Sequence, residues 1–189
     1  MKKTNIFFTF ATLFVLNGCL STSNFYILSV ASQPKVTYAH QNDSIGVEAV
    51  TIPAYLYKRD IAYAKSAREI SFVSDANWGE DLDKGLTHRL IAFLQKKFNQ
   101  PRVYEYPWGT DNHPDKKIRL TISRFIAYKD KVYLDANWDI KKISTKQNRA
   151  KLFQTTVQIE KAGTDGIVDA MNMAFGELEE AIAKGVKSF

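Results

Sequence analysis

Cysteine is almost absent from this chain of 189 residues, since Cys19 is the only one. A single cysteine excludes an internal disulfide framework, a zinc site built from several thiolates and a Cys-x-x-Cys redox pair. Long apolar runs are missing too. The most apolar stretch, residues 6–16, is much shorter than the roughly 20 residues that a membrane-spanning helix needs. The sequence therefore describes neither a disulfide-stapled domain nor a transmembrane protein.

Motifs of the common enzyme classes are also missing. There is no Gly-x-Ser-x-Gly elbow, phosphate-binding loop, dinucleotide fingerprint or His-Glu-x-x-His segment. Two groups of candidate residues remain, and a solvated helix face and a polar loop explain them more simply. The first group is Asp81, Asp83 and His88, and the second is Asp111, His113 and Asp115. We therefore expect no enzymatic activity, no metal site and no bound cofactor.

The first nineteen residues have the pattern of an export signal. Lys2 and Lys3 precede the apolar residues 6–16, and the segment "LNGC" follows. A positive start, a short apolar stretch and a small residue at the break are typical of a secretory signal peptide. "LNGC" resembles the bacterial lipobox, in which the signal is cut before the cysteine. The resemblance implies a signal peptide over residues 1–18 and diacylglycerol and N-acyl chains on Cys19.

An ordinary signal peptide with an incidental cysteine is the alternative. With lipidation, residues 19–24 are a short tether, and several acyl chains hold a protein stably on its membrane. Leu20 follows the cysteine, at the position where enteric bacteria use Asp to retain lipoproteins at the inner membrane. We therefore expect this protein on the periplasmic face of the outer membrane.

Cleavage of the signal removes two lysines and no acid, which lowers the net charge from +6 to +4. Because an exported protein does not meet nucleic acid, we expect no such partner.

Period-two alternation predicts most of the mature chain to be sheet. The cleanest examples are residues 117–125, 132–140 and 152–160, which we expect to form an antiparallel meander with one face on the core. Shorter strands are predicted over 25–30, 45–53, 60–65, 69–73 and 103–108. No linker or repeat divides residues 25–189, so we expect one domain.

Two segments have helical periodicity. Leucines and a phenylalanine recur every four residues in 75–99, where Asp75 or Asn77 is the predicted cap, and a second apolar stripe runs through 165–189. The predicted fold is α/β, with a mixed, largely antiparallel sheet and two main helices packed on it. We expect the strand–helix–strand unit around 69–106 to form a right-handed crossover.

Basic and aromatic residues are candidates for partner contact. The segment 140–151 carries Lys141 and Lys142 and no acid, which suits either a solvated hairpin tip or contact with acidic lipid headgroups or a partner. Trp78 and Trp108 each stand beside a turn or a helix start. Core packing and partner contact are both open for these two indoles, because exposed aromatics anchor interfaces.

Several segments together resemble the ABC-type transport auxiliary lipoproteins, the PqiC/YmbA group. A strand ends in Ile-Pro-x-Tyr-Leu, here with Pro53 and Tyr55, and Arg59 follows. Trp78 precedes the first helix, and a Pro-Trp pair with Trp108 follows the next strand. The resemblance spans about residues 25–185, and it adds Pro53 and Tyr55 to the partner-binding candidates.

This resemblance implies a sandwich fold like that of anticodon-binding domains. It also implies an outer-membrane partner of an MCE-domain periplasmic protein and its ABC transporter, which move lipid between membranes, and a homo-oligomeric ring. One alternative function is an envelope lipoprotein that scaffolds or activates a cell-wall or outer-membrane assembly enzyme. Another is a periplasmic hydrolase, which would depend on His88 or His113.

Overall fold

The three long strands of the sheet come from the alternating residues near the middle of the chain. The structure, a computed structural model, describes residues 23–40, 42–109 and 113–189. β6 (Lys116–Tyr128), β7 (Lys131–Lys142) and β8 (Asn148–Gln158) pair antiparallel in succession, which confirms the predicted meander. Alternate residues of β7, from Val132 to Ile140, are buried, so one face of the meander lies on the core.

The remaining strands extend this sheet beyond β6. They are β1 (Asn24–Tyr26), β2 (Ile45–Val47), β3 (Asp60–Ser66), β4 (Glu69–Trp78) and β5 (Val103–Glu105). The order is β1-β4-β3-β6-β2-β5, and β7 and β8 continue from β6. A short 3-10 helix, η1 (Ala54–Tyr57), connects β2 to β3. The sheet is mixed, because the pairs β1–β4, β3–β6, β2–β6 and β2–β5 are parallel.

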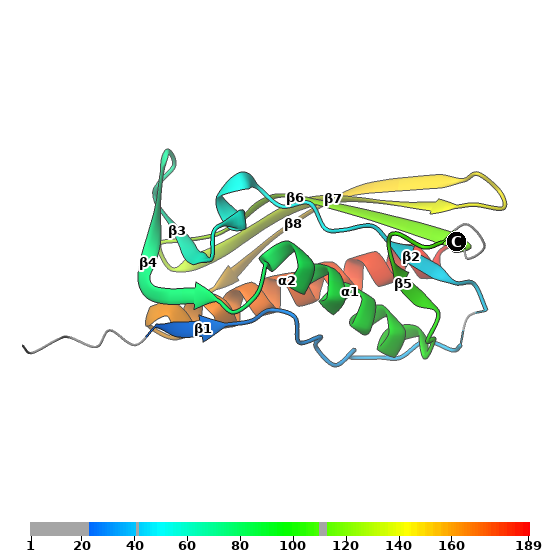
Figure 1. The fold of residues 1–189 in the computed structure, drawn as a ribbon, viewed down its shortest axis with the longest axis horizontal. Helices are drawn as coiled ribbons and strands as arrows, with labels where there is room; N and C mark the ends of the chain where they lie inside the picture. The colour runs from blue at the N-terminus through cyan, green and yellow to red at the C-terminus, as the bar shows by residue number, and fades with distance from the viewer. Residues whose placement is uncertain (1–22, 41, 110–112) are drawn as a thin grey trace, which may run out of the picture.

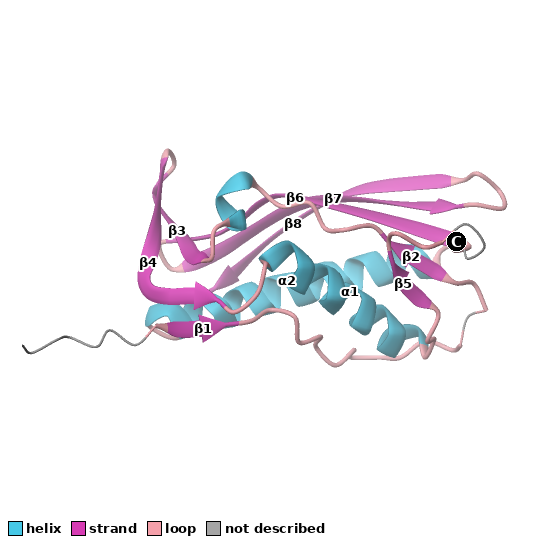
Figure 2. Ribbon diagram, viewed as in Figure 1, coloured by secondary structure: helices cyan, strands magenta, loops and turns pink. Residues whose placement is uncertain are grey.

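Two helices cover one face of the sheet (Figures 1 and 2). α1 (Leu82–Phe98) buries the predicted four-residue repeat, and α2 (Gly163–Lys187) buries most of its predicted stripe. The helices pack between the meander and the segment that follows β1. Within the described part of the chain, no helix is both long and apolar enough to cross a membrane. The predicted α/β fold, with two helices on a mixed sheet, is confirmed.

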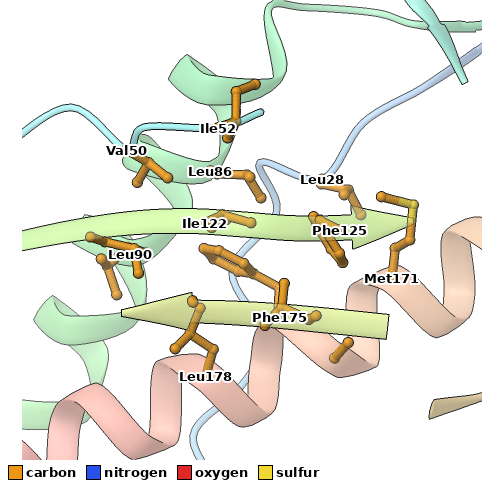
Figure 3. Close-up of a cluster of buried hydrophobic side chains, with 14 of the residues drawn as sticks. Leu28, Val50, Ile52, Leu86, Leu90, Ile122, Phe125, Met171, Phe175 and Leu178 are labelled. Atoms are coloured by element: carbon orange, nitrogen blue, oxygen red, sulfur yellow. The ribbon is translucent and has the colours of Figure 1, made fainter. Parts of the chain in front are cut away.

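The core is formed where both helices meet the middle of β6 and β7. Figure 3 shows side chains from α1, α2, β6 and the 50–52 segment turned toward one another. Phe125 and Phe175 lie at its centre, with ring centroids 6.5 Å apart and no exposed surface. Burial of aromatic side chains is a large part of what stabilises such a fold.

A buried ion pair joins the two helices inside this apolar environment. Arg89 of α1 donates from Nε and Nη2 to the two carboxylate oxygens of Glu179 of α2, each at 3.1 Å, and both side chains are inaccessible to water. Arg89 also donates to the carbonyl of Leu28 and to Asn172, and Ser32 donates to Glu179. The pair therefore fixes α1, α2 and the segment after β1 against one another.

Three sequence predictions about this region are wrong. Residues 75–78 are the end of β4 and not the start of a helix, because Ala76, Asn77 and Trp78 pair with β1. The N-cap position of α1 is Asp81, in place of the predicted Asp75 or Asn77. The predicted right-handed crossover is also absent, since β4 and β5 run antiparallel and lie near opposite ends of the strand order.

Candidate functional site

The residues proposed for chemistry form no common site. The hydrogen bond from Lys84, at 2.7 Å, lowers the pKa of the Asp81 carboxyl, which marks it as a surface ion pair. His88 contacts Glu105 of β5 at 3.2 Å. The Asp115 carboxylate accepts from the backbone N–H and hydroxyl of Ser44, each at 2.7 Å, and these bonds lower the pKa of Asp115. Asp111 is outside the described residues, and no group of three potential metal ligands occurs within them.

Trp108 lies on the sheet in a place that only a glycine leaves open. It follows the edge strand β5 and packs over Gly46 of β2, where an added Cβ would stand 2.7 Å from the indole ring. Tyr106 meets Trp108 edge to face, with centroids 5.1 Å apart. The ammonium of Lys117 stands 5.1 Å from the centroid of the same ring. The indole is therefore half-buried, with a tyrosine and a cation beside it.

β6 and β7 contain two pairs of lysines, and the two lysines of each pair lie directly opposite each other. The two pairs have different surroundings. Lys116 is opposite Lys142, and Asp43 lies 3.2 Å and 3.7 Å from their ammonium groups. Lys117 is opposite Lys141 on the other face of the sheet, away from the helices. Neither Lys117 nor Lys141 forms an ion pair within the described part of the chain. Like charges directly opposite each other destabilise a sheet, so this second pair suits a site that meets an external anion.

These side chains form one surface, which we call the distal surface: Tyr104, Tyr106, Trp108, Lys117 and Lys141. The exposed fractions of Tyr104 and Tyr106 are 41% and 57%, which is high for aromatic side chains. β2 and β5 lie at one end of the elongated molecule, and β1 lies at the other (Figure 1). Aromatic rings beside cations match a partner that offers apolar groups with carboxylates, because the core of an interface is aromatic and charge complementarity selects the partner.

The other candidate residues are elsewhere. Tyr55 is half-buried, and its hydroxyl accepts from the Phe125 N–H at 3.2 Å, next to an irregularity in the β6–β7 pairing. Pro53 accepts from the Leu56 N–H and starts η1. Trp78 is only 2% exposed, so its indole belongs to the core and not to a surface. Pro53 and Tyr55 therefore have structural partners of their own, and Trp78 is removed from the docking candidates.

The basic hairpin between β7 and β8 is only partly available. Lys142 shares Asp43 with Lys116, and Arg149 bonds Ser188 and stands over the Phe189 ring. Lys141 remains exposed on the outer face. Sequence reasoning missed Tyr104, Tyr106 and Lys117, although the two tyrosines and Trp108 are spaced two residues apart. That two-residue spacing was the available signal, although only Tyr104 lies on β5 itself.

Comparison with known proteins identifies the family of this chain and solved structures that share its fold. The family described as ABC-type transport auxiliary lipoprotein component matches residues 26–183. Among curated protein sequences, none is similar enough to match this chain.

Two of the solved structures that match this chain show the same fold along most of its length. One is an uncharacterised protein with 22% identity and a TM-score of 0.73, covering 87% of this chain and 99% of its own. The other is a Xanthomonas campestris protein of the family DUF330, with 12% identity and a TM-score of 0.72, covering 85% of this chain and 93% of its own. Because the family match covers most of the sequence, the chain belongs to the ABC-type transport auxiliary lipoprotein family.

Proposed function

We propose that this chain is a non-catalytic auxiliary subunit of an ABC/MCE-type system that moves lipid between membranes. In this proposal Cys19 carries diacylglycerol and an N-acyl chain, which hold the protein on the periplasmic face of the outer membrane. The folded domain docks the MCE-domain periplasmic protein of the transporter. The family is one of transport lipoproteins, which supports the anchor, because Cys19 is the only cysteine that an acyl chain could modify.

The observation that carries the docking role is the position of the distal surface. β2 and β5 lie at the end of the molecule opposite β1, the first described strand after the proposed tether (Figure 1). Trp108, Lys117 and Lys141 lie beside β2, because Trp108 packs over Gly46, Gly46 pairs with Lys117, and Lys117 pairs with Lys141. A protein held by its N-terminus presents this far end to the periplasm. The two lysines, which form no ion pair with the residues that the structure describes, and the exposed tyrosines would then bind an acidic, partly apolar segment of the transporter's periplasmic protein.

A homo-oligomeric ring is part of this proposal. β8 pairs only with β7 among the described strands, and Leu152 on it is 86% exposed. A long open edge and an exposed leucine are features that a neighbouring copy covers in many assemblies. Native mass spectrometry of the purified lipoprotein would count the copies.

Charge reversal on the distal surface tests the docking role. We expect the double variant Lys117→Glu, Lys141→Glu to lose most of the MCE-domain protein that co-purifies with the wild-type lipoprotein from detergent-solubilised membranes. Quantitative mass spectrometry of the eluates measures the loss. Reversed charges in the same positions repel the acidic partner, and both side chains lie outside the core, so the fold is retained.

The matched control is Lys65→Glu, Arg68→Glu, which makes the same charge change at the exposed β3–β4 hairpin. Equal recovery of the transporter protein with both double variants would contradict docking at the distal surface. Recovery of a cell-wall or outer-membrane assembly enzyme in place of the transporter would support the scaffold function instead.

A further inference from the structure

Three exposed apolar side chains follow the tether directly. Phe25, Ile27 and Val30 have exposed fractions of 67%, 51% and 67%. We call them the β1 patch. They are three of the ten large apolar residues that the described part of the chain leaves exposed, and they fall within six positions. Such a cluster marks an interaction site more often than scattered single residues do.

Phe25 lies on β1, Ile27 follows that strand directly, and Val30 lies a few residues further along the chain. The rest of the fold holds β1 in place. β1 pairs with the end of β4, and the Gly79 N–H donates to the Tyr26 carbonyl at 2.7 Å. The Tyr26 side chain is half-buried, and its hydroxyl donates to Asp165 of α2 at 2.8 Å. Because side chains alternate along a strand, this contact turns Phe25 and Ile27 to the opposite side.

Gly79 extends the apolar character of that side. An added Cβ on Gly79 would stand 3.2 Å from the Ile27 Cγ2 and 3.9 Å from the Phe25 Cβ. Both side chains therefore lie over a bare glycine backbone. The fold does not need their burial, since β1 is an edge strand whose inner contacts come from Tyr26.

The length of chain before β1 identifies what covers the patch. Cys19 is five residues from Asn24, and five extended residues reach at most about 18 Å. If acyl chains on Cys19 enter the bilayer, Phe25 is within a short distance of the lipid headgroups. Aromatic and aliphatic side chains at that depth partition into the boundary between headgroups and acyl chains.

We propose that the β1 patch inserts into the headgroup region of the membrane that holds Cys19. This inference rests on the proposed lipid anchor and adds a second contact, from the folded domain itself. An acyl tether alone lets a domain tumble, whereas a tether and an inserted rigid strand fix one orientation. In that orientation β1 faces the bilayer and the distal surface faces away from it (Figure 1).

A fluorescent probe on the lipidated protein tests the insertion. Acylation converts the Cys19 thiol to a thioether, so the variant Ile27→Cys has one reactive thiol for an NBD label. The labelled lipoprotein is reconstituted into phosphatidylethanolamine and phosphatidylglycerol vesicles with spin-labelled lipid as the quencher. The matched control is Val36→Cys. Val36 is 63% exposed and precedes Tyr38, whose ring lies 4.3 Å from the ammonium of Lys187, at the end of α2 opposite the Asp165 that contacts β1.

We expect the probe at position 27 to lose most of its fluorescence to the spin label, and the probe at position 36 to lose little. Equal, weak quenching at both positions would overturn the insertion. So would a probe at 27 that stays unquenched but becomes shielded as protein concentration rises, which would mean that a second copy covers the patch. Mass spectrometry of the mature chain separates the two claims. An acylated Cys19 with an unquenched position 27 overturns only the insertion, and an unacylated Cys19 overturns the anchor and the insertion together.

Discussion

Arg89 and Glu179 show what a single buried pair does at the scale of residues. Two ionisable side chains have been removed from water to join α1 to α2, and replacing such a buried pair with apolar residues of similar size is often neutral or stabilising. Burial raises the pKa of Glu179 to about 7, and the charge and hydrogen bonds of Arg89 and Ser32 offset only part of that effect. The pair therefore makes the association of the two helices depend on pH.

The sign of this dependence follows from the raised pKa. Between pH 4.5 and about 7 the folded protein keeps a proton on Glu179 that the unfolded chain has released. This group therefore stabilises the fold fully below pH 4.5, and the contribution is lost as the pH rises through 7. In the wild-type protein this group should make the free energy of unfolding about 3 kcal/mol higher at pH 4.5 than above pH 7. We expect Glu179→Gln to remove that difference.

Urea denaturation of both proteins at a series of pH values from 4.5 to 8 measures the effect. Each protein gives a curve of unfolding free energy against pH. Subtracting one curve from the other cancels the contribution of the other titrating groups, which both proteins share. Parallel curves over the whole pH range would show that Glu179 does not titrate there.

Gly46 is the second residue whose change has a defined consequence. We expect Gly46→Ala to displace the Trp108 indole and the Pro114 ring, since the added Cβ would stand 2.5 Å from Pro114 and 2.7 Å from Trp108. Overpacking of this kind costs about 1–3 kcal/mol of folding free energy. Recovery of the co-purifying partner should fall as well. Gly109→Ala is the control, because nothing lies within 4 Å of its added Cβ, and a similar loss from both variants would contradict the role of Gly46.

At the scale of elements, the sequence correctly predicted those strands and helices whose side chains follow a local periodic pattern. The meander β6–β7–β8 and the buried stripes of α1 and α2 follow from alternation and from the four-residue repeat. The pattern gave the wrong start of α1, because Asn77 and Trp78 look like a helix entry until β1, some fifty residues earlier, pairs with them. It also gave no sign that Arg89 is buried, since an arginine on a helix is normally solvated and its partner Glu179 is ninety positions away.

The contact of α2 with β7 depends on a glycine. We expect Gly185→Ala to destabilise the protein by about 1–3 kcal/mol, because the added Cβ would stand 2.8 Å from a ring carbon of the buried Trp138. Thermal unfolding followed by circular dichroism measures the change. Gly176→Ala on the same helix is the matched control. Its Cβ meets nothing closer than 3.5 Å, so helix propensity should make that variant as stable as the wild type or more stable. A Gly185→Ala protein as stable as the control would contradict this packing.

At the scale of the whole molecule, the fold separates its two ends. β1, which follows the proposed tether, lies at one end, and β2 and β5 lie at the other (Figure 1). The aromatic and basic side chains of the distal surface gather beside β2 and β5. Family membership could be predicted from the sequence, because motif order survives when identity is low. The distal surface could not, since Trp108, Lys117 and Lys141 are brought together only by strand pairing between distant segments.

The anchor is tested by its single attachment point. We expect Cys19→Ala to leave the outer-membrane fraction, because the variant has no thiol to acylate and hence no chain in the bilayer. Sucrose-gradient fractionation of cell envelopes with immunoblotting measures this, with Ser21→Ala as the control. A Cys19→Ala protein that still sediments with the outer membrane would contradict lipid anchoring.

With the proposed anchor, the length of β6 would set the distance between the membrane and the far end of the molecule. Its thirteen residues rise about 3.3 Å each, so the strand measures roughly 40 Å and runs along most of the body. A subunit that stands upright on its tether would therefore offer its aromatic tip well out in the compartment. A conduit that arrives from the opposite bilayer would need to cross only the remaining gap.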